Sequence, residues 1–369
     1  MPATPDPPPG TTSSREPTTS RDLTAEELQL ATRNHGMPLE ALRYDVTPIG
    51  LHYLLIHYDI PDIDTGSWRL HLHGLVEREV ELGLDDLRAL PQITRTVTME
   101  CAGNGRARLS PRPLSQPWLY EAVGNARWTG VLVDDVLAET GIGDGVVEAV
   151  FTGADRGVEG GIEQSYQRAV TLEELGDTGA LLAYELNGAP LPPQHGAPLR
   201  LVVPGWYGMT NVKWVTSIEL VDAPFDGFQQ TRSYRFRQSS DELGEPVTRM
   251  HVRSLLIPPG MPDFFSRRRV LDRGEVELQG RAWSGVAPID TVEVSTDEGR
   301  SWRSAELSPP DDPGAWTGFR FVWEAATPGD TVVMCRATDA HGNRQPDDPD
   351  WNLGGYAVNA PHRLEVTVR

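Results

Sequence analysis

The chain has 369 residues, with 53 acidic and 33 basic side chains and a formal net charge of −20. This length suits two domains of roughly 100 to 250 residues better than one hydrophobic core, and so acidic a surface argues against nucleic acid and anionic membranes as partners. With 38% hydrophobic residues, 36 glycines and 31 prolines, the composition predicts a globular protein rich in strands and loops.

The N-terminal segment 1–21 is rich in proline, serine and threonine and holds no apolar run. It predicts a disordered tail and not a signal peptide. The two cysteines, Cys101 and Cys335, are far apart in the sequence and give no disulfide framework. We therefore expect a cytoplasmic protein.

Short helices alternate with strands up to about residue 245 and predict a mixed α+β domain over 22–245. Its first helix opens with a capping box made by Thr24 and Glu27. The strand around His71 and His73 would turn both rings to one face, but with no third ligand nearby we interpret them as surface or hydrogen-bonded histidines and not as a metal site. The other expected helices span 84–90, 133–140 and 172–175, and the expected strands span 55–61, 68–76, 148–151 and 199–203.

The character of the chain changes in the segment 246–369, where short alternating strands are separated by turn residues such as Asp297-Glu298-Gly299. About seven such strands predict an immunoglobulin-like β-sandwich. Cys335 would lie in the middle of one of them as a small buried apolar residue.

Cys101 would be offered at the end of a strand in "TVTMECAGNGRAR". Val97, Met99 and Cys101 alternate and share one face, and a glycine-rich turn follows. Arg106 and Arg108 behind the turn would lower the pKa of the thiol and favour the thiolate, which is the form that binds metals.

From these residues alone three classes of function stay open. Cys101 could be a nucleophile with His195 or His35 as its base, or a metal ligand whose partners come from a cofactor, and a non-enzymatic pair of binding modules needs neither. His195, Arg200 and Lys213 fall in one Gly/Pro-rich stretch, which favours a pocket for a large anionic cofactor.

Several motifs in order resemble the sulfite oxidase and sulfite dehydrogenase family of molybdenum-cofactor oxidoreductases, from about residue 31 to the end of the chain. They are "RNH" at 33–35, "CAGNGR" at 101–106, "LAYELNGAPLPPQHGAPLRLVVPG" at 182–205, "NVKW" at 211–214, "RSYRF" at 232–236 and "PDWNLGGYAVNAPHRLEV" at 349–366.

The resemblance implies a molybdopterin-binding oxidoreductase domain over 22–245 and a dimerisation domain over 246–369. It assigns Cys101 as the molybdenum ligand and implies oxidation of sulfite, or a related small oxyanion, to sulfate by oxygen-atom transfer. Without a haem domain before residue 30, electrons would pass to an external acceptor, and the −20 charge favours a basic cytochrome. The implied cofactor-binding residues are Arg33, Asn34, His35, Asp155, His195, Arg200, Asn211, Val212 and Lys213, and the implied catalytic residues are Tyr234, Arg33, Arg106 and Trp118.

One departure concerns the family pattern W-N-L-R-G near the C-terminus, which reads Trp351-Asn352-Leu353-Gly354-Gly355 here. The missing arginine would remove a charge-assisted contact of about 1.5 to 3 kcal/mol. This predicts weaker sulfite binding or another substrate, unless Arg232, Arg237 or His251 compensates. It also leaves room for a reductase of S- or N-oxides that uses the same metal centre.

Overall fold

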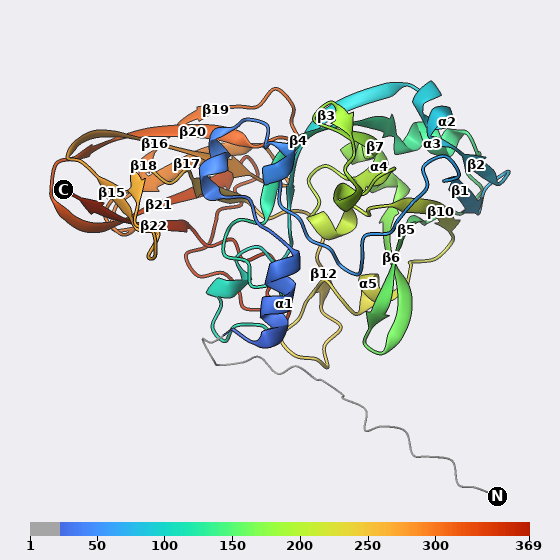
Figure 1. The fold of residues 1–369 in the computed structure, drawn as a ribbon, viewed down its shortest axis with the longest axis horizontal. Coiled ribbons are helices and arrows are strands. Elements are labelled where there is room, and N and C mark those ends of the chain that lie inside the picture. Colours follow the sequence, from blue (N-terminus) through green and yellow to red (C-terminus); the bar gives the residue numbers. More distant parts are fainter. Residues whose placement is uncertain (1–22) are drawn as a thin grey trace, which may run out of the picture.

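The computed structural model describes residues 23–369, so the tail predicted over 1–21 lies outside the described residues. The protein has a mixed α+β part, cyan to yellow in Figure 1, beside a β-sandwich made by the C-terminal third of the chain. Its helices are α1 (Ala25–Arg33), α2 (Leu84–Ala89), α3 (Val133–Ala138), α4 (Leu172–Thr178) and α5 (Phe228–Thr231), with short 3₁₀ helices η1 (Leu39–Arg43), η2 (Ile49–Leu51), η3 (Arg106–Arg108), η4 (Pro193–His195) and η5 (Gly208–Thr210).

The α+β part is built on two sheets. One has the order β2-β1-β10-β5-β6, with β1 and β10 parallel and the other neighbours antiparallel; the second has the order β3-β4-β7-β8, with β9 also on β7. The strands are β1 (Leu70–Gly74), β2 (Val80–Leu82), β3 (Gln92–Glu100), β4 (Val123–Leu132), β5 (Glu148–Glu159), β6 (Ile162–Thr171), β7 (Leu181–Leu186), β8 (Ala189–Pro190), β9 (Arg200–Val202) and β10 (Val215–Val221).

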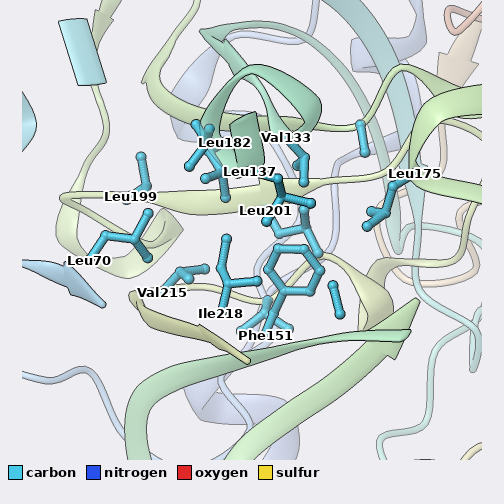
Figure 2. Packing of buried hydrophobic residues seen from close by; sticks show 14 of the residues in the cluster. Leu70, Val133, Leu137, Phe151, Leu175, Leu182, Leu199, Leu201, Val215 and Ile218 are labelled. Atoms are coloured by element: carbon cyan, nitrogen blue, oxygen red, sulfur yellow. The ribbon is translucent and has the colours of Figure 1, made fainter. Parts of the chain in front are cut away.

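Apolar side chains from both sheets and from α3 meet in one buried cluster, shown in Figure 2. Val133 and Leu137 of α3 point toward Leu182 of β7 and toward Phe151 and Ile218 of the other sheet. Each such side chain contributes about 1.5 to 3 kcal/mol when removed from water. This core fixes the strand ends on which the candidate site is built.

The C-terminal part is a sandwich of two sheets, β13-β16-β20-β19 and β14-β15-β22-β21-β17-β18, packed over a core that includes Leu278, Phe319 and the fully buried Cys335. Its strands are β13 (Arg253–Leu256), β14 (Met261–Pro262), β15 (Arg269–Leu271), β16 (Gly274–Trp283), β17 (Ile289–Ser295), β18 (Arg303–Ser304), β19 (Glu306–Ser308), β20 (Thr317–Ala325), β21 (Gly329–Asp339) and β22 (His362–Val368). A small hairpin of β11 (Arg235–Phe236) and β12 (Glu245–Pro246) precedes it.

The α+β class with an immunoglobulin-like sandwich is confirmed, and so are the Thr24 capping box, the helices that α2, α3 and α4 form, and the hairpin between β17 and β18. The strand predicted over 55–61 is wrong. Only Leu54 forms a bridge, to His35, and the side chains that follow line a cavity instead. The domain division at residue 245 stays a prediction.

A buried ion pair joins the two parts. Glu100, the last residue of β3, accepts hydrogen bonds from Arg253 Nη1 of β13 at 2.7 Å and from Trp283 Nε1 of β16 at 2.9 Å. Both charges are almost fully buried. Removal of one partner of such a pair leaves the other charge buried without compensation, which is strongly destabilising. The pair therefore holds the end of β3 firmly against the sandwich. Among residues 23–369, no helix is long and apolar enough to cross a membrane.

Candidate functional site

A cavity of about 690 Å³, counting the part that opens to solvent, lies at the end of β3 and the start of β9, against the middle of β5 and β6 and near the loops around η4 and η5. Most of its wall is apolar or aromatic, with a few charged groups, as is usual for a site that takes a small molecule or cofactor. The side chains or backbone of His52, Tyr53, Leu54, Leu55, His57, Met99, Cys101, Asp155, Tyr166, His195, Arg200, Gly208, Met209, Asn211, Lys213, Trp214 and Tyr234 line it.

Cys101 follows directly on β3 and lies in the cavity wall, on the same face as Val97 and Met99, as predicted. The turn after it is tightly packed, since a Cβ at Gly103 would lie 2.5 Å from the Arg106 guanidinium and would displace it. Arg106 is therefore the group that lies close to the backbone of this turn. Burial raises the pKa of the Cys101 thiol, and Arg106 only partly opposes this, so the predicted net lowering is wrong for the protein without a metal.

Two cations, the buried Arg200 of β9 and the half-buried Lys213, face the cavity. They pack around Gly196, whose absent side chain leaves both within about 3 Å of the position that a Cβ would take. Arg200 donates to the carbonyls of His195 at 3.0 Å and Asn211 at 3.2 Å, and Lys213 Nζ donates to the carbonyl of Leu55 at 2.9 Å. Carbonyls orient these cations without neutralising them.

Desolvation acts strongly on both cations. Burial lowers the pKa of Arg200 to about 10, and burial together with Arg200 lowers the pKa of Lys213 to about 7. An anion bound beside them would reverse both shifts, because an opposite charge favours the protonated form.

Asp155 is the only carboxylate among the described residues that line the cavity. A break in the register between β5 and β6, from Thr152 to Arg156, turns it inward. Burial raises its pKa to about 6, although Lys213 opposes the shift. The cavity thus holds two cations and one carboxylate whose pKa is raised, and this balance of charge favours an anionic ligand.

Two buried histidines complete the polar wall. His52 and His195 meet edge to face, with their ring centres 5.7 Å apart. Burial lowers the pKa of His52 to about 4 and that of His195 to about 2, so both are neutral at physiological pH. Neutral His195 is also suited to act as a hydrogen-bond partner for a ligand.

Of the nine predicted cofactor-binding residues, five line this cavity: Asp155, His195, Arg200, Asn211 and Lys213. The other four do not. Arg33 donates to the carbonyls of residues 56–58, the Asn34 amide bonds Leu30, Ile56 and Gln116, His35 is exposed and Val212 is part of the core. Arg33, Asn34 and His35 hold or flank the wall that residues 52–57 form, and Val212 lies between Asn211 and Lys213 in the sequence.

The predicted catalytic residues also separate. Tyr234 lines the cavity, whereas the buried Trp118 packs behind it in the same apolar cluster as Cys101. Arg106 donates to the carbonyls of Gln116 at 3.1 Å and Gly354 at 2.8 Å, with its guanidinium over the ring of Tyr356. Its charge reaches Cys101 across the turn without facing the cavity.

Comparison with known proteins agrees with this geometry. The protein-family model described as oxidoreductase molybdopterin binding domain matches residues 57–229. The family model described as Mo-co oxidoreductase dimerisation domain matches residues 245–369. The sulfite oxidase of Arabidopsis thaliana is 32% identical over 356 residues, covering 86% of this chain and 87% of that protein. The chain belongs to the sulfite oxidase family of molybdenum-cofactor oxidoreductases.

Two further relatives extend the comparison. Mitochondrial sulfite oxidase of Mus musculus is 33% identical over 345 residues, and the match covers 88% of this chain but 62% of that protein. The crystal structure of the sulfane dehydrogenase SoxCD from Paracoccus pantotrophus superposes with a TM-score of 0.78 and 26% identity, covering 90% of this chain and 84% of that one. The family thus includes proteins whose names refer to different substrates.

Sequence reasoning missed several wall residues of this family member. His52, Tyr53 and His57 lie in "LHYLLIHY", which alternates like a strand, and Tyr166 lies in β6. The available signal was aromatic rings and histidines recurring within a short apolar run. A second unused signal is the single lysine, Lys213, since every other Lys or Arg position in the sequence is an arginine.

The structure also explains Gly354. A Cβ there would lie 2.1 Å from Cε2 of Tyr356, so the ring of Tyr356 occupies the space that a side chain at 354 needs. That ring lies 5.3 Å from the ring of Tyr234, centre to centre. None of the three compensating candidates, Arg232, Arg237 and His251, lines the cavity that holds Cys101.

Gly354→Ala is therefore expected to destabilise the protein by about 1 to 3 kcal/mol, because the added methyl group collides with the Tyr356 ring. In denaturant unfolding, the double variant with Tyr356→Ala should lose at least about 1 kcal/mol less than the sum of the two single changes. Gly50→Ala is the control, since a Cβ there meets nothing within 4 Å. Strictly additive losses would show that the ring does not exclude a side chain at 354.

Proposed function

We propose that this chain is a molybdenum-cofactor oxidoreductase that oxidises sulfite, or a related small oxyanion, to sulfate. The observation that carries the proposal is a half-buried thiol, Cys101, in the wall of a cavity whose cations exceed its carboxylates. A soft thiolate ligand suits molybdenum. The buried Nε of Arg200 and the buried Nε2 of His52 have no hydrogen-bond partner within the described residues, which is consistent with a site that binds a ligand.

In this proposal Cys101 binds the metal as a thiolate, and Arg200, Asn211 and Lys213 hold the anionic end of the cofactor. Its metal supplies the oxygen-atom transfer, which no side chain can perform. Asp155 and neutral His195 offer further hydrogen-bond partners at the wall. Arg33, Asn34, His35 and Val212 are proposed to act through the backbone they support.

The substrate residues are proposed to be Tyr234, Arg106, Trp118 and Arg33. Burial raises the pKa of Tyr234, so its phenol stays protonated and can donate a hydrogen bond to an oxyanion. Arg106 contributes positive potential near Cys101, and Trp118 closes the apolar side of the pocket.

The overall reaction converts sulfite and water to sulfate, two protons and two electrons. The protein must therefore pass electrons to an external acceptor, and the net charge of −20 favours one with a basic face. The match of residues 245–369 to a dimerisation domain supports a homodimer. A cytoplasmic location belongs to the proposal as well, supported by two cysteines that are both unpaired.

Steady-state assays on molybdenum-loaded protein test this function, with sulfite and an artificial one-electron acceptor in one arm and sulfoxides or N-oxides with a reductant in the other. We expect turnover of sulfite and stoichiometric molybdenum. Reduction of a sulfoxide without oxidation of millimolar sulfite would instead support the alternative, an S- or N-oxide reductase with the same centre. The exclusion of an arginine from position 354 is what keeps that alternative open.

Two other classes make different predictions. A pair of binding modules without a metal would purify with negligible molybdenum from a host that makes the cofactor. A cysteine hydrolase would let a thiol reagent label Cys101 in the native, metal-loaded protein, where a metal-bound thiolate is protected.

A further inference from the structure

Arg168 of β6 is a buried charge that the proposed function does not use. Its side chain is 2% exposed, and burial lowers its pKa. Nη1 donates to the backbone carbonyl of Gln229, while the buried Nε has no hydrogen-bond partner. Within residues 23–369 it forms no ion pair, in contrast to other buried arginines such as Arg253 and Arg336.

The position of Arg168 relates it to the cavity. In β6, residues two apart share a face, so Arg168 lies on the same side as Tyr166, which lines the cavity and donates its hydroxyl to the Met209 carbonyl at 2.7 Å. The Arg168 guanidinium lies 5.8 Å from the centre of the Tyr234 ring, which also lines the cavity. Two tyrosines thus stand between this charge and the space beside Cys101.

An unpaired buried charge is costly, and proteins retain such groups mostly for function. In the described part of the chain, no carboxylate contacts the Arg168 guanidinium, and Glu148 acts on it only from beyond ion-pair distance. The field of Arg168 acts through a low-dielectric wall, where it decays less than in water. An oxyanion beside Tyr166 that accepts a hydrogen bond from Tyr234 would supply the missing negative charge.

We propose that Arg168 is a positioning residue that draws the anionic substrate toward Tyr166 and Tyr234 and selects a doubly charged oxyanion. This inference rests on the proposed function for the identity of the substrate, but its charge argument needs only an anion in the cavity. Arg168 belongs to the α+β part of the chain, and its charge would offset the arginine that the family pattern has where this chain has Gly354.

The test compares Arg168→Met and Arg168→Lys with wild type in the molybdenum-loaded protein, with sulfite KM and kcat and with equilibrium binding of sulfate by calorimetry. Arg168→Met removes the charge at similar volume, and we expect KM and the sulfate Kd each to rise about tenfold or more, with kcat within about threefold. Arg168→Lys restores the charge and should return both constants to within about threefold of wild type.

Stability separates this role from a structural one. Replacing a buried charge that lacks a carboxylate partner is expected to leave the Tm of Arg168→Met unchanged or higher. Arg336→Met is the matched control, because this arginine is paired with Glu293 in the sandwich, and its loss should lower Tm without changing KM. If Arg168→Met does not fold, Arg168→Gln takes its place in the same measurements.

The outcomes are distinct. A KM and a sulfate Kd of Arg168→Met within twofold of wild type would overturn the inference, as would a lysine variant as impaired as the methionine variant. Failure of wild type to bind sulfate at all would overturn it as well. Sulfate binding that depends on Arg168 in a protein that does not oxidise sulfite would sustain the inference and refute the proposed reaction.

Discussion

Cys101→Ser is expected to lower sulfite turnover by about three orders of magnitude or more while the protein keeps its pterin. A serine hydroxyl is a hard, weakly acidic donor and does not replace a soft thiolate at the metal. The groups proposed to hold the anionic part of the cofactor, such as Arg200 and Lys213, are untouched by the change. Pterin fluorescence, molybdenum content and steady-state kinetics on the same preparation measure the three quantities separately.

The second cysteine provides the control. Cys335 is fully buried in β21 of the sandwich, so Cys335→Ala creates a small void and costs about 1 kcal/mol of stability, with turnover unchanged. Activity of Cys101→Ser within tenfold of wild type would refute the ligand role of Cys101. Equal loss of activity in both variants would point to a folding defect common to any cysteine replacement.

Lys213→Met is expected to weaken retention of the cofactor by about ten- to a hundredfold, the effect of losing one charge-assisted hydrogen bond to an anion. The measurement is the fraction of pterin kept after dialysis of protein from a cofactor-competent host. Lys213→Arg is the matched variant, because it keeps the charge but not the compact ammonium group. Its retention of the cofactor should lie between that of wild type and that of Lys213→Met. Retention by Lys213→Met equal to wild type would remove Lys213 from the cofactor site.

The same residue predicts a pH dependence in the cofactor-free protein. Burial lowers the pKa of Lys213 to about 7, against an ordinary value of 10.5. Between these values the unfolded chain holds the proton and the folded chain does not, so folding stability contributed by Lys213 rises with pH through this window. The stability of wild type relative to Lys213→Met should rise by a few kcal/mol from pH 7 to 10.5 and stay constant below pH 7.

This difference cancels the titrations common to both proteins and leaves that of Lys213 together with the part of the Asp155 and His195 pKa shifts that Lys213 itself causes. A direct check is available, since Lys213 is the only lysine of the chain. Lysine labelled with ¹³C at Cε gives one side-chain resonance, whose shift reports the pKa without assignment. A titration midpoint near 10.5 in the cofactor-free protein would contradict the burial of this ammonium group.

Much of the fold follows from local sequence signals. The Thr24 capping box, the turn at Glu298 and the strand around Cys335 each depend on neighbouring residues, and the structure contains each of them. The segment 55–61 shows the limit of such signals. Its residues form no strand, and Leu55 and His57 line the cavity together with the consecutive residues 52–54.

The sequence by itself determined the family, the cysteine at the end of β3 and the Gly/Pro-rich stretch that carries Arg200 and Lys213, because these are contiguous motifs whose chemistry is legible in residue types and spacing. Only the tertiary structure decided that burial raises the pKa of Cys101, that Tyr356 fills the place above Gly354 and that Arg168 stands unpaired behind Tyr234. Desolvation, steric exclusion and missing counter-charges depend on groups brought together from distant parts of the chain, and no local pattern encodes them.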